Sequence, residues 1–268
     1  FSPSPTGAIS LGLGRRRDFT GGTSDPLVLS SASRFQFEDD GRYRDNFAYR
    51  LDQVRQMLGE NLTPGAGSLA RASMDQAHSL IDQTQAALDE YEGFAGAAEY
   101  MNESPSRAMQ DMARLLHAGF DTRVYYTGFG GYDTHGDQGG GVVDARHGRL
   151  LKRLDNAIGS FEADMQAMSI WQNTCIVVIS EFGRRCFENG STGTDHGHGN
   201  CVLVIGGNVN GGLYGPDLTP ELLNENWLPG LVDFRDIYRE ILSNHLGAGN
   251  VDGVFPEPQD AVQSLGII

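Results

Sequence analysis

Apolar residues at three- and four-residue spacing predict helices through much of the first half of the chain. The first of these patterns covers residues 42–60, and a longer one covers about residues 68–101. A third helix is expected after Ser104, which can cap it, with Pro105 in its first turn and Gly119 at its end. The chain is therefore expected to be mainly helical between residue 42 and Gly119.

Short apolar runs predict strands in the second half. Residues 123–127 are mostly β-branched or aromatic, which favours a strand. Residues 173–180 and 200–207 contain the continuous apolar runs "CIVVI" and "VLVI". Such runs are typical of strands that are buried on both faces, as in parallel sheets.

Two further amphipathic helices separate or follow these strands. One is expected over about residues 144–168, and the other over residues 233–247 with Asp233 as its N-cap and Gly247 as its stop. This order predicts an α/β fold with a mostly parallel sheet flanked by helices. Ligand sites in such folds lie beyond the carboxyl ends of the strands.

The domain organisation follows from a change in composition near residue 41. Residues 1–41 are rich in Gly, Ser and Pro and predict an extended arm or connecting loop. Residues 42–268 predict a single α/β domain with a helical insertion at about 68–118.

The charge balance restricts the partners that this protein can have. The chain has 20 Lys and Arg against 35 Asp and Glu, a net charge of −15 at pH 7. This charge would repel a phosphate backbone, so nucleic-acid binding is not expected. A small anionic substrate would need locally concentrated positive charge, from a metal ion or from arginines. No apolar run approaches the ~18 residues of a membrane helix, so no membrane span is expected either.

Carboxylate and imidazole side chains gather in the loops that follow the predicted strands. Such mixed ligands suit zinc, manganese or iron. Six donors are enough for one ion, and two ions in one site could brace the displacement at an ester. The predicted metal ligands are Asp133, His135, Glu181, Asp195, His196 and His198.

Several of these residues have an alternative explanation. Asp133 and His135 could be turn formers at the end of a strand. Glu181 could be a solvated loop carboxylate, and His198 could lie behind the ligands or donate to a phosphate. The segment "GTDHGHG", which carries Asp195 and His196, is the strongest part of the pattern.

Two arginines follow Glu181 closely. In an acidic protein, Arg184 and Arg185 are the natural clamp for an anionic group. Alternatively, either arginine could pair with a neighbouring carboxylate such as Glu188.

Two of the three cysteines bracket this region. A bridge between Cys186 and Cys201 would restrict the unfolded chain and imply an oxidising compartment. Two independent thiols are the alternative.

The segments "GGYDTHGDQ", "SEFGRRCFENGSTGTDHGHGNCVLVIGG" and "DFRDIYREILSNHLG" resemble the bacterial domain-of-unknown-function 1501 family. That family is similar to the alkaline phosphatase and sulfatase superfamily, whose members hold metal at the end of a parallel sheet. The resemblance implies an alkaline phosphatase-like fold. Family members usually carry a twin-arginine signal, which implies export to the periplasm or the outside of the cell.

The resemblance also places individual residues. Glu181 stands where the superfamily strand carries a metal-binding Asp, and Phe182 stands where it carries His. "GTDHGHG" is similar to the Gly-Thr-Asp-His segment of metal-dependent mutases, which makes His196 the best single candidate for a ligand. Asp133 and His135 occupy the region of the superfamily's Asp and His pair, two residues apart rather than four.

The superfamily's first metal-binding Asp and its Ser or Thr nucleophile follow the first strand, and residues 1–41 contain no such motif. An N-terminal portion is therefore expected to be absent from this chain, and a missing segment or a partner would complete that side of the sheet.

These observations predict an exported metal-dependent hydrolase of a phosphate or sulfate ester. Zinc or manganese is the expected metal, with one ion or two. The alternative is a non-catalytic secreted binding or assembly protein that keeps the fold and a structural metal.

Overall fold

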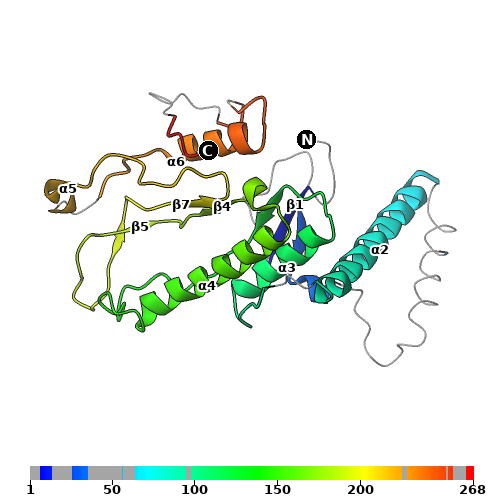
Figure 1. Ribbon diagram of the computed structural model, residues 1–268, viewed down its shortest axis with the longest axis horizontal. Helices are drawn as coiled ribbons and strands as arrows, with labels where there is room; N and C mark the ends of the chain where they lie inside the picture. The colour runs from blue at the N-terminus through cyan, green and yellow to red at the C-terminus, as the bar shows by residue number, and fades with distance from the viewer. Residues whose placement is uncertain are drawn as a thin grey trace. The chain divides into compact units, whose positions relative to one another are not determined.

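The computed structural model describes residues 7–13, 26–35, 56, 64–94, 98–224, 228–251, 253–255 and 264–268. Apart from residue 56, the helix predicted over 42–60 lies outside these residues. The chain forms two compact units (Figure 1). The first unit comprises Phe1–Ala97 and Asn102–Gly128, and the second comprises Ala98–Met101 and Phe129–Ile268.

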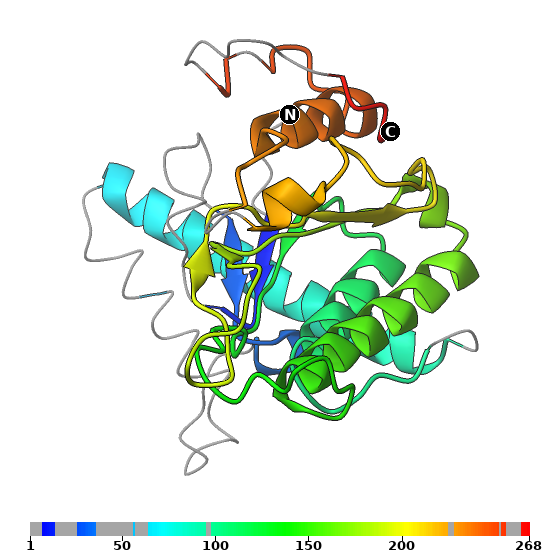
Figure 2. The same cartoon turned by 90° about the vertical axis from the view of Figure 1, so that its left-hand side faces the viewer.

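A small parallel sheet lies in the first unit. Its central strand β1 (Ala8–Leu11) pairs in parallel with β2 (Leu27–Leu29) on one side and with β3 (Val124–Tyr126) on the other. Strands β1 and β2 lie side by side in Figure 2. Ile9 and Leu11 of β1 are fully buried.

These strands correct the expectation of an extended arm over residues 1–41. The apolar stretches "AISL" and "LVL" are only four and three residues long and stand among Gly, Ser and Pro, so they carry little local signal. They form strands because β1 pairs with a strand on each side. One of these partners, β3, lies more than 110 residues after β1 in the sequence. Burial of their apolar side chains then stabilises the pairing.

The helices of the first unit follow the predicted periodicity. Helix α2 (Pro64–Glu92) ends earlier than expected, and α3 (Ser106–His117) is followed by Gly119 in the left-handed region at φ +75°. Pro105, not Ser104, is the residue that precedes α3. In α3 the buried Asp111 accepts a hydrogen bond from the Ala32 backbone N–H at 2.8 Å. Ala32 begins the short helix η2 (Ala32–Arg34), so this bond ties the segment after β2 to α3.

The second unit contains α4 (Arg146–Ala167), η4 (Trp171–Asn173), β4 (Cys175–Val178) and β7 (Leu203–Gly206). The helix and both strands were predicted, but β4 and β7 are antiparallel, with Cys175 opposite Gly206. The chain leaves β4, passes through a long hairpin and returns to β7 without a crossover helix (Figure 1). Because a parallel pair requires such a crossover, the returning strand can only run antiparallel. The mostly parallel sheet predicted from the apolar runs is wrong for this pair.

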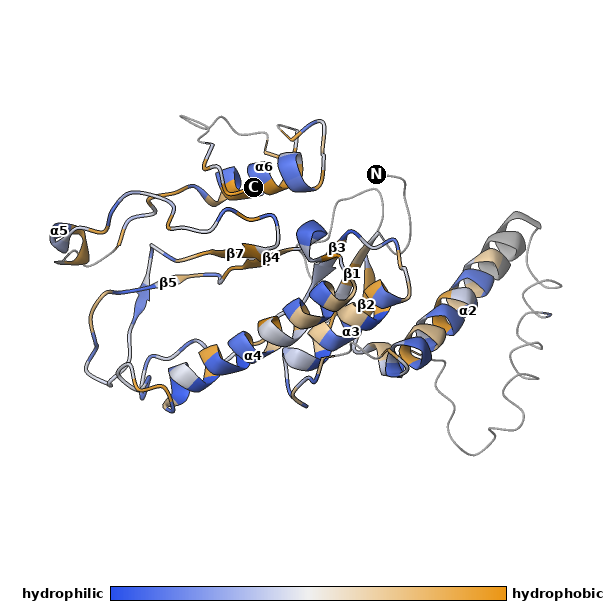
Figure 3. Ribbon diagram, in the orientation of Figure 1, coloured by the Kyte–Doolittle hydropathy of each residue, from blue (hydrophilic) through white to orange (hydrophobic). Residues whose placement is uncertain are grey.

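Three short helical elements follow these strands toward the C-terminus. They are α5 (Pro220–Asn224), α6 (Phe234–Glu240) and η5 (Ile241–His245). As predicted, Asp233 caps α6 by accepting a hydrogen bond from the Arg235 N–H at 2.9 Å, and Gly247 follows with φ +66°. Ile237 and Ile241 form a core with residues of β4 and β7, and both strands are coloured as hydrophobic in Figure 3.

The described residues thus have a mixed α/β fold with a small parallel sheet, helices and two antiparallel strand pairs, β4 with β7 and a short pair formed by residues 183–184 and 196–197. Among the described residues, no helix combines the length and apolar character needed to cross a membrane.

Candidate metal centre

The loop after β3 is held to helix α4 before it reaches the candidate ligands. The Tyr132 hydroxyl donates to the Leu150 carbonyl at 3.0 Å, and partial burial raises the pKa of this phenol. Thr134 is almost fully buried, and its hydroxyl donates to Gln138 Oε1 at 3.0 Å. These contacts hold the backbone on both sides of Asp133.

A β-hairpin lies opposite this loop. Strand β5 (Gly183–Arg184) pairs antiparallel with β6 (His196–Gly197), so that Arg184 lies opposite His196. A Cβ atom on Gly197 would lie 2.6 Å from the Arg184 carbonyl carbon. The glycine is therefore required for the close approach of the two strands.

The tip of this hairpin contacts the loop after β3 through the backbone. The Thr194 N–H donates to the Thr134 carbonyl at 3.2 Å, and the Gln138 N–H donates to the Thr192 carbonyl at 3.0 Å. Between them, a Cβ atom on Gly193 would lie 2.3 Å from the His135 carbonyl carbon. Two segments about 60 residues apart in sequence are thus in direct backbone contact.

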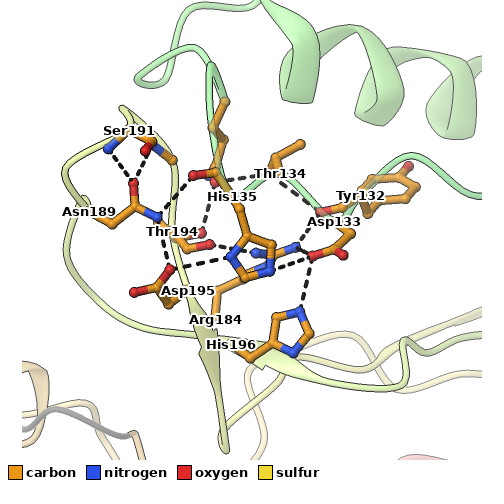
Figure 4. Close-up of polar contacts among 12 residues, drawn as sticks. Tyr132, Asp133, Thr134, His135, Arg184, Asn189, Ser191, Thr194, Asp195 and His196 are labelled. Atoms are coloured by element: carbon orange, nitrogen blue, oxygen red, sulfur yellow. Dashed lines mark hydrogen bonds and ion pairs between the residues drawn. The ribbon is translucent and has the colours of Figure 1, made fainter.

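Three side chains converge where the two segments meet (Figure 4). Oδ1 of Asp133 lies 3.0 Å from Nε2 of His135 and 3.0 Å from Nε2 of His196. The ligand atoms of these three residues lie within 4.8 Å of one another, and their side chains are 49%, 57% and 47% exposed for His135, Asp133 and His196. These three residues belong to the set of six ligands that was predicted from the sequence.

The donor set and its spacing fit a divalent transition metal. Two imidazoles and a carboxylate are ligands that zinc and manganese accept. Ligands about 2.0–2.1 Å from one ion stand about 2.9–3.4 Å apart at octahedral or tetrahedral angles. The observed separations of 3.0 Å fall in this range.

Arg184 holds this group together instead of reaching outward as a clamp. Its guanidinium donates to Asp133 Oδ1 at 2.7 Å, to the Tyr132 carbonyl at 2.8 Å and to the Thr194 carbonyl at 2.5 Å. The guanidinium therefore cross-links the two segments that carry the ligands. The guanidinium that was predicted to clamp an anion therefore already donates to three acceptors of the protein.

The ring of Phe182 stacks on the ring of His196. The two rings are stacked with centroids 3.8 Å apart and an angle of 16° between their planes. The Arg184 guanidinium also lies over the Phe182 ring, with its central carbon 5.1 Å from the ring centroid. Phe182 is therefore an aromatic ring that packs against a candidate ligand.

Asp195 contacts a ligand instead of joining the group itself. Its Oδ1 lies 3.3 Å from Nδ1 of His135 and accepts from Asn189 Nδ2 at 2.9 Å. A carboxylate that holds the second nitrogen of a metal-binding histidine fixes the ring orientation. The sequence predicted Asp195 as a ligand, and the structure places it behind His135.

Hydrogen-bond donors lower the pKa of both carboxyl groups. The hydrogen bond from His196, followed by those from Arg184 and the nearby His135, lowers the pKa of Asp133. The hydrogen bonds from Asn189 and His135 lower the pKa of Asp195. Both groups are therefore held in the ionised form that a metal site needs.

The other predicted site residues lie outside this group. Glu181 and His198 are exposed and are not among the ligand atoms that converge. The Arg185 backbone N–H donates to the Asp195 carbonyl at 3.0 Å, and its guanidinium lies 5.9 Å from the Phe187 ring centroid. Among the described residues, this is the one group in which three or more such ligand atoms converge.

The predicted disulfide is not formed. All three cysteines are free thiols. Cys186 and Cys201 are exposed, and Cys175 is partly exposed. The alternative of independent thiols therefore describes the structure.

Asn189 is the residue that the sequence reasoning missed. The dipeptide Asn189–Gly190 is a common signal for a hairpin turn, and it stands midway between "GRR" and "DHG". That signal predicts that the chain reverses direction between β5 and β6.

The fold and the site together define a mixed α/β protein with a candidate site for a divalent metal ion. The family described as Protein of unknown function (DUF1501) matches residues 31–244, and the chain belongs to this family. No curated protein and no solved structure matches the chain.

Proposed function

We propose that Asp133, His135 and His196 bind a zinc or manganese ion and that the protein is an exported hydrolase of phosphate or sulfate esters. The observation that carries this proposal is the convergence of three exposed ligand atoms within 4.8 Å of one another, with Asp133 Oδ1 3.0 Å from each histidine nitrogen. Catalytic metal sites commonly use three protein ligands and keep a further position open, whereas structural zinc sites are usually closed by four.

The exposure of the three side chains supports a catalytic site. Each ligand is about half exposed, so water and a small ester can approach from the side away from the protein. A bound divalent ion would polarise the ester oxygen and lower the pKa of a bound water. It would also supply the local positive charge that an anionic substrate needs near a protein of net charge −15.

The surrounding residues would prepare the site before substrate arrives. Arg184 fixes the Asp133 carboxylate, and Phe182 limits the rotation of the His196 ring. Positioned ligands reduce the reorganisation that binding and catalysis require.

Membership of a superfamily with alkaline phosphatases and sulfatases is part of this proposal. It rests on the likeness of the Thr194–His196 segment to the Gly-Thr-Asp-His motif of metal-dependent mutases, with His196 in the group described above. Export to the periplasm or outside is proposed on the same family resemblance.

One observation favours a second candidate, a non-catalytic secreted binding or assembly protein with a structural metal. The Arg184 guanidinium donates to Asp133, to the Tyr132 carbonyl and to the Thr194 carbonyl, so this arginine holds the site together. In that case the protein would hold the ion without turning over an ester.

Elemental analysis of protein purified without added metal, followed by a panel of phosphate and sulfate esters with and without chelator, tests the proposal. We expect close to one zinc or manganese per chain and ester hydrolysis that chelator abolishes. His196→Ala should lose the metal, whereas His198→Ala, a matched histidine two residues away in the same segment, should keep it. Metal without turnover would favour the second candidate, and equal metal content in both variants would overturn the assigned site.

A further inference from the structure

Asn189 makes contacts at both ends of its side-chain amide. Its Oδ1 accepts hydrogen bonds from the backbone N–H groups of Ser191 at 2.9 Å and Gly193 at 3.1 Å. Its Nδ2 donates to the His135 carbonyl at 2.9 Å and to Asp195 Oδ1 at 2.9 Å. The oxygen therefore shapes the hairpin tip, while the nitrogen reaches the candidate metal centre (Figure 4).

The Asp195 oxygen that accepts a hydrogen bond from Asn189 also faces His135. Asp195 Oδ1 lies 3.3 Å from Nδ1 of His135, while Nε2 of the same ring lies 3.0 Å from Asp133 Oδ1. A neutral imidazole has one proton to place on one of these two nitrogens. The second nitrogen then keeps the lone pair that a metal ligand must offer.

The neighbours of the two carboxylates decide where the proton is placed. Asp133 Oδ1 already lies within hydrogen-bond distance of Arg184 and His196, so it has donors without His135. Asp195 Oδ1 accepts a hydrogen bond from the neutral amide of Asn189 besides its contact with His135, and Arg185 acts on this carboxylate only through its charge. The proton of neutral His135 is therefore more stable on Nδ1, beside Asp195.

We propose that Asn189 is a positioning residue of the metal centre: through Asp195 it keeps the His135 proton on Nδ1 and leaves Nε2 for the ion. The inference rests on the proposed metal site but concerns a residue that does not touch the ion. Loss of an outer partner of a metal-binding histidine typically weakens metal binding by about 10- to 100-fold.

The substitution Asn189→Asp separates this role from a role in shaping the hairpin. Aspartate keeps an acceptor for the Ser191 and Gly193 N–H groups but loses the donor to Asp195, next to which it adds a like charge. Asn200→Asp is the matched control, because Asn200 also accepts from a backbone N–H, that of Cys201, and donates to the Ser180 hydroxyl. Both variants change the net charge by the same amount.

Two measurements test the proposal. The first is the zinc dissociation constant of the full chain, which we expect Asn189→Asp to raise by about 10- to 100-fold relative to Asn200→Asp. The second is a long-range ¹H–¹⁵N correlation spectrum of metal-free protein at about pH 8.5, where imidazoles of ordinary pKa are neutral. It should show the His135 proton on Nδ1 in the native chain and displaced from Nδ1 in Asn189→Asp.

The outcomes separate this inference from the proposed function. A native chain that binds no zinc or manganese overturns the proposed function, while the spectrum of metal-free protein still decides the place of the proton. Equal zinc affinity in the two variants, or a His135 proton unchanged by Asn189→Asp, overturns the inference. If Asn189→Asp does not fold, Asp195→Asn removes the carboxylate that faces Nδ1 of His135, and it should also displace the proton and weaken zinc binding.

Discussion

At the scale of single residues, one carboxylate oxygen organises the candidate site. Asp133 Oδ1 lies within 3.0 Å of donor atoms from Arg184, His135 and His196. The Asp133 side chain is more than half exposed, so solvent screens these pairs and each contributes little to stability by itself. Their importance lies in the geometry that they hold for a metal ion.

The lowered pKa of Asp133 leads to a prediction about acid stability. Because the folded-state pKa lies below the ordinary 3.8, the stabilisation is complete above that value and is lost as the pH falls through the lowered pKa. Between about pH 5 and about pH 3, the free energy of unfolding of the metal-free native chain should fall more than that of Asp133→Asn. Urea unfolding followed by circular dichroism measures both.

Asp217→Asn, at an exposed carboxylate away from the site, is the control for this comparison. It should retain the acid response of the native chain. An Asp133→Asn chain with the same acid response as the native chain would show that the cationic donors do not hold Asp133 in the folded protein.

At the scale of elements, the hairpin formed by β5 and β6 depends on glycines at defined positions. Gly193 faces the backbone of His135, whereas nothing lies within 4 Å of a Cβ atom placed on Gly190. Both residues are in the same loop between the two strands. The loop therefore contains one glycine that a side chain would displace and one that it would not.

Gly193→Ala should push the hairpin tip away from the loop that carries Asp133 and His135. Forcing a methyl group into a packed contact typically costs about 1–3 kcal/mol. We expect that loss in the free energy of unfolding, together with weaker metal binding, from denaturant titration and zinc titration. Gly190→Ala should match the native chain in both measurements. Equal behaviour of the two variants would contradict the observed contact.

The elements also show where sequence reasoning succeeded and failed. Helix α4, the strand β3 and the cap at Asp233 were predicted because periodicity and capping depend on residues close together in the chain. The direction of β7 relative to β4 was predicted wrongly, because an apolar run reports burial and not strand direction. Strands β1 and β2 were missed because their pairing, not their composition, makes them strands.

At the scale of the whole molecule, the C-terminal residues are tied to the second unit by one buried carboxylate. Glu240, which is 7% exposed, accepts hydrogen bonds from the backbone N–H groups of Leu265, Gly266 and Ile268 at 3.0–3.1 Å. Ile267 packs into the same core as Ile237 and Ile241. The carboxylate therefore satisfies three backbone donors that no strand partner satisfies.

Glu240→Ala should reduce the free energy of unfolding by on the order of 2–3 kcal/mol, because it removes the buried charged acceptor of three part-buried backbone donors. Glu240→Gln keeps an acceptor of the same shape and should lose less. Denaturant unfolding measures both losses, and faster amide hydrogen exchange at residues 265–268 should accompany the larger one. An alanine variant as stable as the native chain would show that these bonds add no net stability.

The chemistry of the candidate site is readable along the chain, because side-chain type and glycine placement are local properties. The sequence was sufficient to propose Asp133, His135 and His196 as ligands and to identify the family. It was not sufficient to separate them from Glu181, Asp195 and His198, which have the same kinds of donor atom.

That separation came from contacts between residues about 60 positions apart. His196 meets Asp133 across 63 residues, and Asp195 meets His135 across 60, because the backbone of the hairpin tip rests on the loop after β3. Arg184 became a cross-link because three acceptors surround it in the folded chain. Distances of 3 Å between such residues are set by backbone closure and packing, and no pattern of neighbouring residues encodes them.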